Sequence, residues 1–164
     1  HVEMFRAIFA PESFALWSPT RANAARAAEA VGAELAPSAE ACCEGADVVI
    51  GCTSATEPTL RDAWLREGAL VVSVGAPLRR WRECDDALMA RTLVVDSREA
   101  TRAEAGDVLA TGAEIAAEIG EIIAGDASVD PAATRVFKSG GLAVEDAAAA
   151  ALVLETLGIG APAG

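Results

Sequence analysis

The residues with the clearest potential for chemistry are a lysine, a serine and two glycines in the last third of the chain. Residues 134–146 read TRVFKSGGLAVED, so that a β-rich run leads into Lys138 and Ser139, a glycine pair follows, and an acidic first turn opens an alanine-rich segment. This order is typical of a strand, a tight turn and the start of a helix. We expect the backbone N–H groups at that helix start to be free to bind an anion or a polar ligand.

The elements that must position this turn alternate between strand-like and helix-like segments. Apolar runs predict strands at residues 14–17, 46–53, 69–75, 91–96 and 135–137. Spacing and composition predict helices at residues 2–9, 21–31, 60–66, 83–90, 101–109, 113–124 and 144–157. Strands that alternate with helices indicate an α/β fold, here a Rossmann-like, doubly wound parallel sheet.

Composition favours a single acidic domain over residues 1–164. The chain is 52% apolar, which suffices for one substantial core, and its formal net charge is −12. Basic residues do not cluster with aromatic ones, so nucleic acid is a poor candidate partner. We expect a cytoplasmic protein with no membrane partner, because no apolar run approaches the ~20 residues of a membrane span and no signal-peptide pattern is present.

The cysteines do not indicate a metal site. Cys42 and Cys43 are adjacent, Cys52 and Cys84 lie far from them, and the only histidine is His1. These spacings lack the paired ligands of a structural zinc site. We therefore expect no metal and reduced cysteines that pack as small apolar side chains.

Two further motifs reveal a resemblance. Residues 105–109 read AGDVL and residues 118–125 read EIGEIIAG, upstream of the KSGG turn. With these motifs the sequence resembles the ornithine cyclodeaminase/mu-crystallin family of dinucleotide-dependent enzymes over nearly its whole length. The resemblance implies that the chain is the cofactor-binding part of a two-domain protein. Most catalytic and substrate-binding groups would then lie in a separate N-terminal domain that also forms a homodimer, and helix 144–157 could pack toward that domain.

The start of the chain bears on the sheet. A Gly-x-Gly-x-x-Gly loop, which cradles the pyrophosphate of a dinucleotide, should precede the first helix, and this chain begins at His1 with that helix. We expect the first strand and the glycine loop to come from upstream residues of a longer protein. A sheet in the usual 3-2-1-4-5-6 order would then lack a central strand here, and a complete sheet within these residues would contradict the expectation.

The turn after the second strand of such a fold selects the cofactor. An acidic residue there binds the ribose 2′-hydroxyl and repels a 2′-phosphate, whereas this turn offers Ser18, Thr20 and Arg21 as donors and no acid. NADP(H) is therefore favoured and NAD(H) remains possible. Ser18 or Thr20 could also cap the following helix. The resemblance places cofactor contacts on Ser18, Pro19, Thr20 and Asn23, although Pro19 departs from the arginine that the family pattern has there.

Small polar residues end other strands, where a flat cofactor could approach the backbone, although such residues are also ordinary in turns. The resemblance places the nucleotide beside Thr53 and Ser54. It implies that the nicotinamide lies near Val74, Ala76 and Ser139. Pro77 and Glu104 would lie near the substrate. Asp96 could face the same crevice or cap a helix, and the sequence leaves these two roles open.

The resemblance implies an oxidoreductase. Such an enzyme would use NAD(P)H to reduce a cyclic imino acid, of the pyrroline- or piperideine-2-carboxylate type, or would dehydrogenate an amino acid. One alternative is an ornithine cyclodeaminase, a lyase that converts ornithine to proline and ammonia with NAD. The lyases carry a proton-relaying aspartate where this chain has Pro77, which disfavours that reaction. The second alternative is a non-catalytic, NADPH-dependent binding protein.

Overall fold

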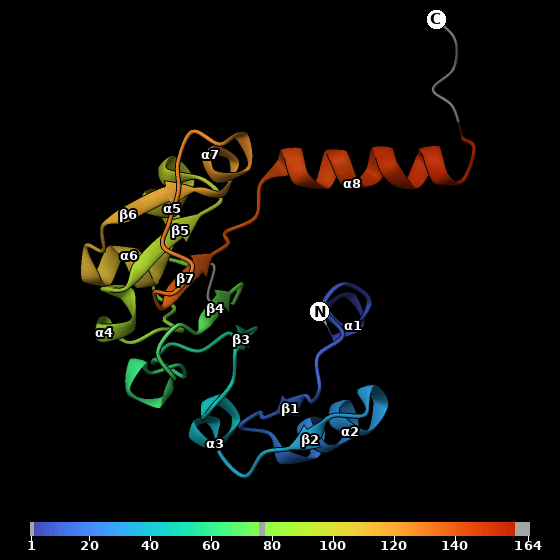
Figure 1. The fold of residues 1–164 in the computed structure, drawn as a ribbon, viewed down its shortest axis with the longest axis vertical. Helices are drawn as coiled ribbons and strands as arrows, with labels where there is room; N and C mark the ends of the chain where they lie inside the picture. Colours follow the sequence, from blue (N-terminus) through green and yellow to red (C-terminus); the bar gives the residue numbers. More distant parts are fainter. Residues whose placement is uncertain (1, 76–77, 160–164) are drawn as a thin grey trace, which may run out of the picture.

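The computed structural model describes residues 2–75 and 78–159. Helices and strands alternate along the chain, and two segments leave the main body, namely residues 2–35 and the long helix over residues 143–156 (Figure 1). In chain order the elements are α1 (Val2–Phe9), β1 (Ala15–Leu16), α2 (Arg21–Val31), β2 (Glu34–Leu35), α3 (Ala39–Cys43), β3 (Val48–Gly51), the 3₁₀-helix η1 (Asp62–Trp64), β4 (Leu70–Ser73), α4 (Asp86–Met89), β5 (Thr92–Val95), α5 (Arg98–Glu104), α6 (Gly106–Thr111), β6 (Ile115–Glu118), α7 (Ile119–Ala124), β7 (Arg135–Lys138) and α8 (Ala143–Thr156).

The main sheet has five parallel strands in the order β3-β4-β7-β5-β6. The last strand in the chain, β7, thus lies at the centre. Its final residue, Lys138, is in register with Ser73 of β4 and Val95 of β5. This parallel α/β sheet confirms the fold class expected from the alternating pattern.

The core lies on one face of this sheet. Alternate strand residues such as Val71 and Val136 are fully buried against Leu88 and Met89 of α4 and Val108 of α6. Because successive strand side chains point to opposite faces, the intervening positions of β3, β4 and β7 are only partly covered. The packed face therefore holds the strands together and fixes the edge at which they end.

The remaining strands form a separate two-stranded parallel sheet, in which β1 pairs with β2. Neither strand pairs with β3 in the described residues, and in Figure 1 they lie with α2 apart from the main sheet. A complete, self-contained sheet, which would contradict an upstream first strand, is not what the described residues form. That the missing strand comes from upstream residues stays a prediction.

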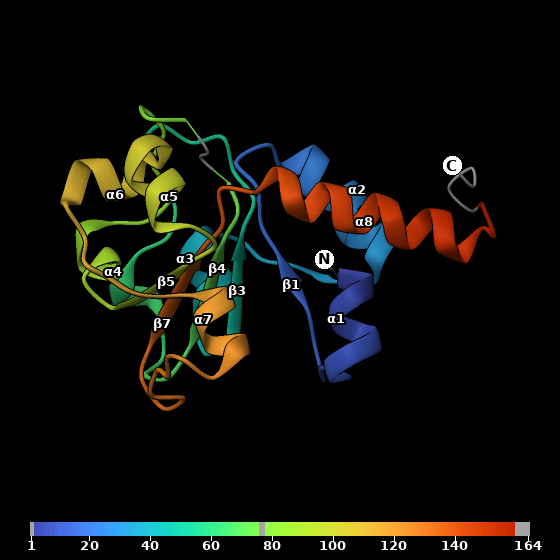
Figure 2. The same cartoon turned by 90° about the horizontal axis from the view of Figure 1, so that it is seen from above.

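Helix α8 extends away from the main sheet (Figures 1 and 2), and none of its residues is buried. Its exposed apolar side chains include Val144, Leu152 and Leu157. Among the residues described, no helix has the length and apolar character needed to cross a membrane.

Several predicted helices are wrong in extent. Residues 113–124 are not one helix, because β6 occupies their first half. Its alternating burial suits an edge strand, and pairing with β5 overrides the helix propensity of its alanines. The predicted helix 101–109 is divided into α5 and α6 at Ala105, whose ψ of 110° is extended.

The other differences concern short elements. Of residues 60–66 only η1 is helical, and of residues 83–90 only α4 is. Glu83 lies in extended chain before α4, because its side chain and backbone are bonded to residues of other elements. Strand β2 and helix α3 were not predicted. The remaining predicted strands and helices are confirmed within a few residues.

Candidate functional site

The loops that follow β1, β3, β4 and β7 lie along the upper side of Figure 2. This is the carboxyl edge of the strands, where parallel α/β proteins bind their ligands in a crevice. Of the sequence-predicted residues, Val74 and Ser139 directly follow β4 and β7, and Thr53 lies two residues after the end of β3. The fold therefore brings the expected cofactor contacts of the main sheet to one edge.

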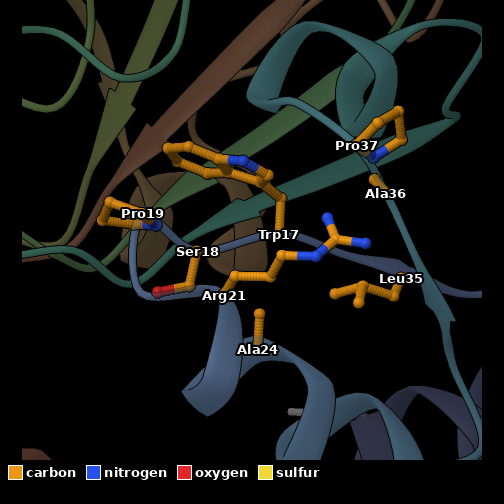
Figure 3. Close-up of a pocket in the computed structure, with 8 residues that line it drawn as sticks. All are labelled: Trp17, Ser18, Pro19, Arg21, Ala24, Leu35, Ala36 and Pro37. Atoms are coloured by element: carbon orange, nitrogen blue, oxygen red, sulfur yellow. The ribbon is translucent and has the colours of Figure 1, made fainter.

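A pocket of about 160 Å³ lies at the carboxyl end of β1. Figure 3 shows that Arg21 extends its guanidinium into the space between Trp17 and Leu35. The other lining residues are Ser18, Pro19, Ala24, Ala36 and Pro37. The lining contains no carboxylate, and among the described residues Arg21 has no ion pair with an acidic side chain. The pocket therefore presents one positive charge to a ligand.

The start of α2 borders this pocket. Thr20 is the N-cap residue of α2, yet its side chain accepts no hydrogen bond from the first turn. The hydroxyl of Ser18 accepts a weak bond of 3.4 Å from the Thr20 N–H, and the amide oxygen of Asn23 accepts a bond of 2.6 Å from Arg26. Neither Ser18 nor Thr20 thus caps the first turn of α2, in contrast to the capping role that the sequence left open.

A buried polar network that the sequence did not reveal lies beneath the same edge. The Glu83 carboxylate is fully buried and accepts four hydrogen bonds. Its Oε1 accepts from the N–H and the hydroxyl of Thr53, each at 2.7 Å. Its Oε2 accepts from the Ser73 hydroxyl at 2.6 Å and from the Gly75 N–H at 3.1 Å. One side chain therefore ties the ends of β3 and β4 together.

Lys138 links β7 to this network. It is the only lysine of the chain and is fully buried. Its Nζ donates to the Ser73 hydroxyl at 3.0 Å and to the Gly75 carbonyl at 2.6 Å, and it lies 3.3 Å from Oδ2 of the buried Asp107. Asp107 Oδ1 in turn accepts from the N–H groups of Glu83 and Cys84. Two carboxylates and one ammonium group thus fix three strand ends.

The glycine turn after β7 differs from the expectation. The N–H groups of Gly140 and Gly141 are not free, because each donates to Asp96 Oδ2 at 2.7 Å. The Ser139 hydroxyl donates to the same oxygen at 3.2 Å. Asp96 therefore anchors the turn, and the side chain that caps α5 is Ser97. An anion cannot take the place that this carboxylate occupies, although Ser139 can still accept a hydrogen bond.

The other predicted site residues are placed as follows. Ser54 is exposed next to Thr53, and Val74 is half-buried between Ser73 and Gly75. Glu104 is an exposed residue at the end of α5, near the segment where Arg79 donates to the Ala103 carbonyl. Ala76 and Pro77 lie outside the described residues. That Ser54, Val74 and Glu104 contact a ligand stays a prediction.

Comparison with known proteins identifies the family. The model of the ornithine cyclodeaminase/mu-crystallin family matches residues 1–159. The chain belongs to this family. Ketimine reductase mu-crystallin of Mus musculus is 45% identical over 159 residues, which are 95% of this chain and 51% of the mouse protein. The Δ1-pyrroline-2-carboxylate/Δ1-piperideine-2-carboxylate reductase of Azospirillum brasilense is 34% identical over 157 residues, 91% of this chain and 49% of that protein.

A solved structure of the same kind agrees with the fold. The Δ1-pyrroline-2-carboxylate reductase of Thermococcus litoralis, in complex with NADH and L-proline, superposes with a TM-score of 0.77 at 32% identity. The match covers 91% of this chain and 52% of that one. The chain thus spans about half the length of the family members it matches.

The cysteines of this family member carry no disulfide in the described residues. Burial raises the pKa of the Cys43 thiol to about 11, and burial together with the nearby Asp107 raises that of Cys84 to about 12. Both thiols are therefore protonated and inert near neutral pH. Cys52 is the exposed exception to the packing that the sequence led us to expect.

The ion pair between Arg98 and Glu121, beside the carboxyl end of β6, should make the stability of the fold depend on pH. Both Arg98 terminal nitrogens donate to the Glu121 carboxylate at 2.7 Å, which lowers the Glu121 pKa from 4.5 to about 2. A carboxyl group whose pKa is lower in the folded state stabilises the fold above its unfolded pKa and loses this effect as the pH falls toward the folded value. We expect the difference in urea midpoint between the wild type and Glu121→Gln to be full above about pH 5 and to shrink toward pH 3. A difference that did not change with pH would contradict this assignment.

Proposed function

We propose that this chain is the cofactor-binding part of an NAD(P)H-dependent oxidoreductase that reduces cyclic imino acids, of the pyrroline- or piperideine-2-carboxylate type, or dehydrogenates the matching amino acid. The observation that carries the proposal is that the turn after β1, which lines the pocket around Arg21, and the loops after β3, β4 and β7 lie on the same side of the molecule (Figure 2). Two relatives support it, one named a ketimine reductase and the other a Δ1-pyrroline-2-carboxylate/Δ1-piperideine-2-carboxylate reductase.

The residues fit a dinucleotide laid across this edge. One end of the cofactor would enter the pocket around Arg21, where the uncapped first turn of α2 offers N–H groups. The other end would then cross the carboxyl ends of the main sheet to Thr53, Val74 and Ser139. A bound nicotinamide would supply the hydride. The residues at this edge would bind the nicotinamide ring and fix its orientation toward the imine carbon of the substrate.

Arg21 supports a preference for NADP(H) over NAD(H). A 2′-phosphate carries a negative charge that Arg21 can bind through two N–H groups, whereas a free ribose hydroxyl gains much less from a guanidinium. Among the described residues that line the pocket, none carries a carboxylate that would repel that phosphate. The turn after β1 is therefore suited to the phosphorylated cofactor.

The Arg21→Gln variant of the whole protein tests this preference. Loss of one hydrogen bond to a charged group, about 1.5–3 kcal/mol, corresponds to a rise of roughly 10- to 100-fold in the KM for NADPH. The KM for NADH should change less than about threefold, because NADH carries no 2′-phosphate for Arg21 to bind. Arg102→Gln, at an exposed position in the last turn of α5, is the matched control and should change neither value. Equal effects of Arg21→Gln on both cofactors would contradict the preference.

The activity itself is tested on the whole protein by following the absorbance of NADPH with Δ1-piperideine-2-carboxylate and Δ1-pyrroline-2-carboxylate. A parallel assay measures ammonia from ornithine in the presence of NAD. Imine-dependent loss of NADPH is the expected result. Ammonia release without net change of NADH would instead identify a cyclodeaminase, and NADPH binding without turnover of either substrate would identify a binding protein.

A further inference from the structure

Glu83 performs no step in the proposed reaction, yet its carboxylate is buried at the edge where the cofactor is proposed to bind. Its side chain has no exposed surface, and a carboxylate is costly to remove from water unless its lone pairs are filled. The four hydrogen bonds from Thr53, Ser73 and Gly75 fill the sites that a carboxylate offers. Every one of these donors lies at or just after the end of β3 or β4.

Glycines leave just enough space for this carboxylate. A Cβ atom on Gly51 would lie 2.6 Å from Glu83 Cδ and 2.7 Å from its Oε2. A Cβ atom on Gly75 would contact Glu83 Oε1 and the backbone of Thr53. The backbone of both strand ends is thus packed directly on the carboxylate, and neither end can shift without breaking a hydrogen bond.

The network also reaches β7 and Ser139, the residue that follows this strand. Ser73 accepts from Lys138 through its hydroxyl and from the Ser139 N–H, at 3.0 Å, through its carbonyl. Val74 lies between Ser73 and Gly75, both of which donate to Glu83. The network therefore holds Thr53 and Ser139 by hydrogen bonds, and it holds Val74 through its neighbours Ser73 and Gly75.

We propose that Glu83 is a positioning residue for the nicotinamide end of the cofactor, in that it fixes the backbone of Thr53, Val74 and Gly75 in the crevice. This inference rests on the proposed function, because the pocket around Arg21 takes the adenosine end and so directs the other end toward β4 and β7. Glu83 acts through the strand ends and touches no ligand atom. The adenosine end, held by the separate β1–β2 sheet, does not depend on it.

The Glu83→Gln variant of the whole protein separates positioning from folding. An amide keeps the size of the side chain, but its NH₂ group cannot accept a hydrogen bond. It must therefore leave the N–H of either Thr53 or Gly75 without a partner. We expect the Kd for NADPH to rise at least about tenfold, as befits a buried donor that is left unpaired. The Kd for 2′,5′-ADP, which lacks the nicotinamide, should stay within about twofold of the wild type.

The controls make each outcome decisive. Glu114→Gln, at an exposed position just before β6, should leave both Kd values unchanged. Selective loss of NADPH affinity supports the proposal. Equal weakening of both ligands would assign Glu83 a purely structural role, and no change in either would also overturn the proposal. A wild type that binds 2′,5′-ADP but gains nothing from the nicotinamide would overturn the proposed function and this inference together.

A second variant covers the case in which Glu83→Gln does not fold. Ser73→Ala removes one donor to Glu83 and one acceptor of Lys138, while it leaves the carboxylate bonded to Thr53 and Gly75. We expect the same selective loss of NADPH affinity, about three- to tenfold, since one hydrogen bond is removed. Unchanged NADPH affinity in a folded Ser73→Ala variant would overturn the proposal.

Discussion

Replacement of Lys138 by methionine should lower the free energy of unfolding by about 3–5 kcal/mol, the cost of breaking a buried ion pair by removing one partner. Methionine is apolar and of similar length, so the loss arises from the partners that remain. Asp107 would keep its buried negative charge but lose the ammonium group that lies 3.3 Å from it. The Gly75 carbonyl would lose the hydrogen bond of 2.6 Å that it accepts from Lys138. Urea unfolding of the whole protein measures the effect.

A double variant isolates the charge. Asp107→Asn removes the second charge of the pair but keeps an oxygen that can accept from the N–H groups of Glu83 and Cys84. The Lys138→Met/Asp107→Asn protein should therefore be more stable than Lys138→Met alone, because no uncompensated charge remains on Asp107. A loss below about 1 kcal/mol for Lys138→Met, the value of an exposed pair, would show that the ion pair is not buried as described.

The Gly106→Ala variant should also be strongly destabilised, by roughly 2–4 kcal/mol, because the new methyl group meets backbone that has no room to move. A Cβ atom on Gly106 would contact the carbonyl oxygen of Trp81 and lie 2.8 Å from that of Arg79 and 2.9 Å from that of Leu78. The loop before Glu83 would be forced away from α6. The midpoint of thermal unfolding should therefore fall, and the Kd for NADPH should rise in the same variant.

Gly120→Ala is the matched control for this variant. Gly120 is the second residue of α7, and a Cβ atom there meets nothing within 4 Å. Alanine should be neutral or stabilising by up to about 1 kcal/mol, since glycine has the lower helix propensity. A Gly106→Ala protein as stable as Gly120→Ala would contradict the tight packing of the 78–81 loop on α6.

The sequence predicted the fold well where the pattern was local and strong. Continuous apolar runs such as those of β3 and β4 identify buried parallel strands, and Gly32, with a positive φ of 61°, marks the end of α2 as predicted. Strand β6 was missed because its residues favour a helix by themselves. Its conformation depends on pairing with β5, which no local pattern encodes.

The placement of strand-end residues at one edge of the sheet could be predicted from the sequence, but the contacts among the side chains at that edge could not. Strand-end residues such as Thr53 and Ser139 could be found because parallel strands end at a common edge. The roles of Asp96 and Glu83 could not, because each bonds to residues far away in sequence, up to 45 positions for Asp96. No local pattern marked Glu83, which the sequence placed at the start of a predicted helix over residues 83–90.

In the proposed function, the carboxyl edge of these strands binds NAD(P)H, and the end of the cofactor that carries the 2′-phosphate lies at Arg21. Titration of the whole protein with NADPH, followed by fluorescence of the reduced nicotinamide, tests it most directly. We expect saturable binding that 2′,5′-ADP displaces and that Arg21→Gln weakens roughly 10-fold or more. No saturable binding, or binding that 2′,5′-ADP and Arg21→Gln leave unchanged, would contradict the account.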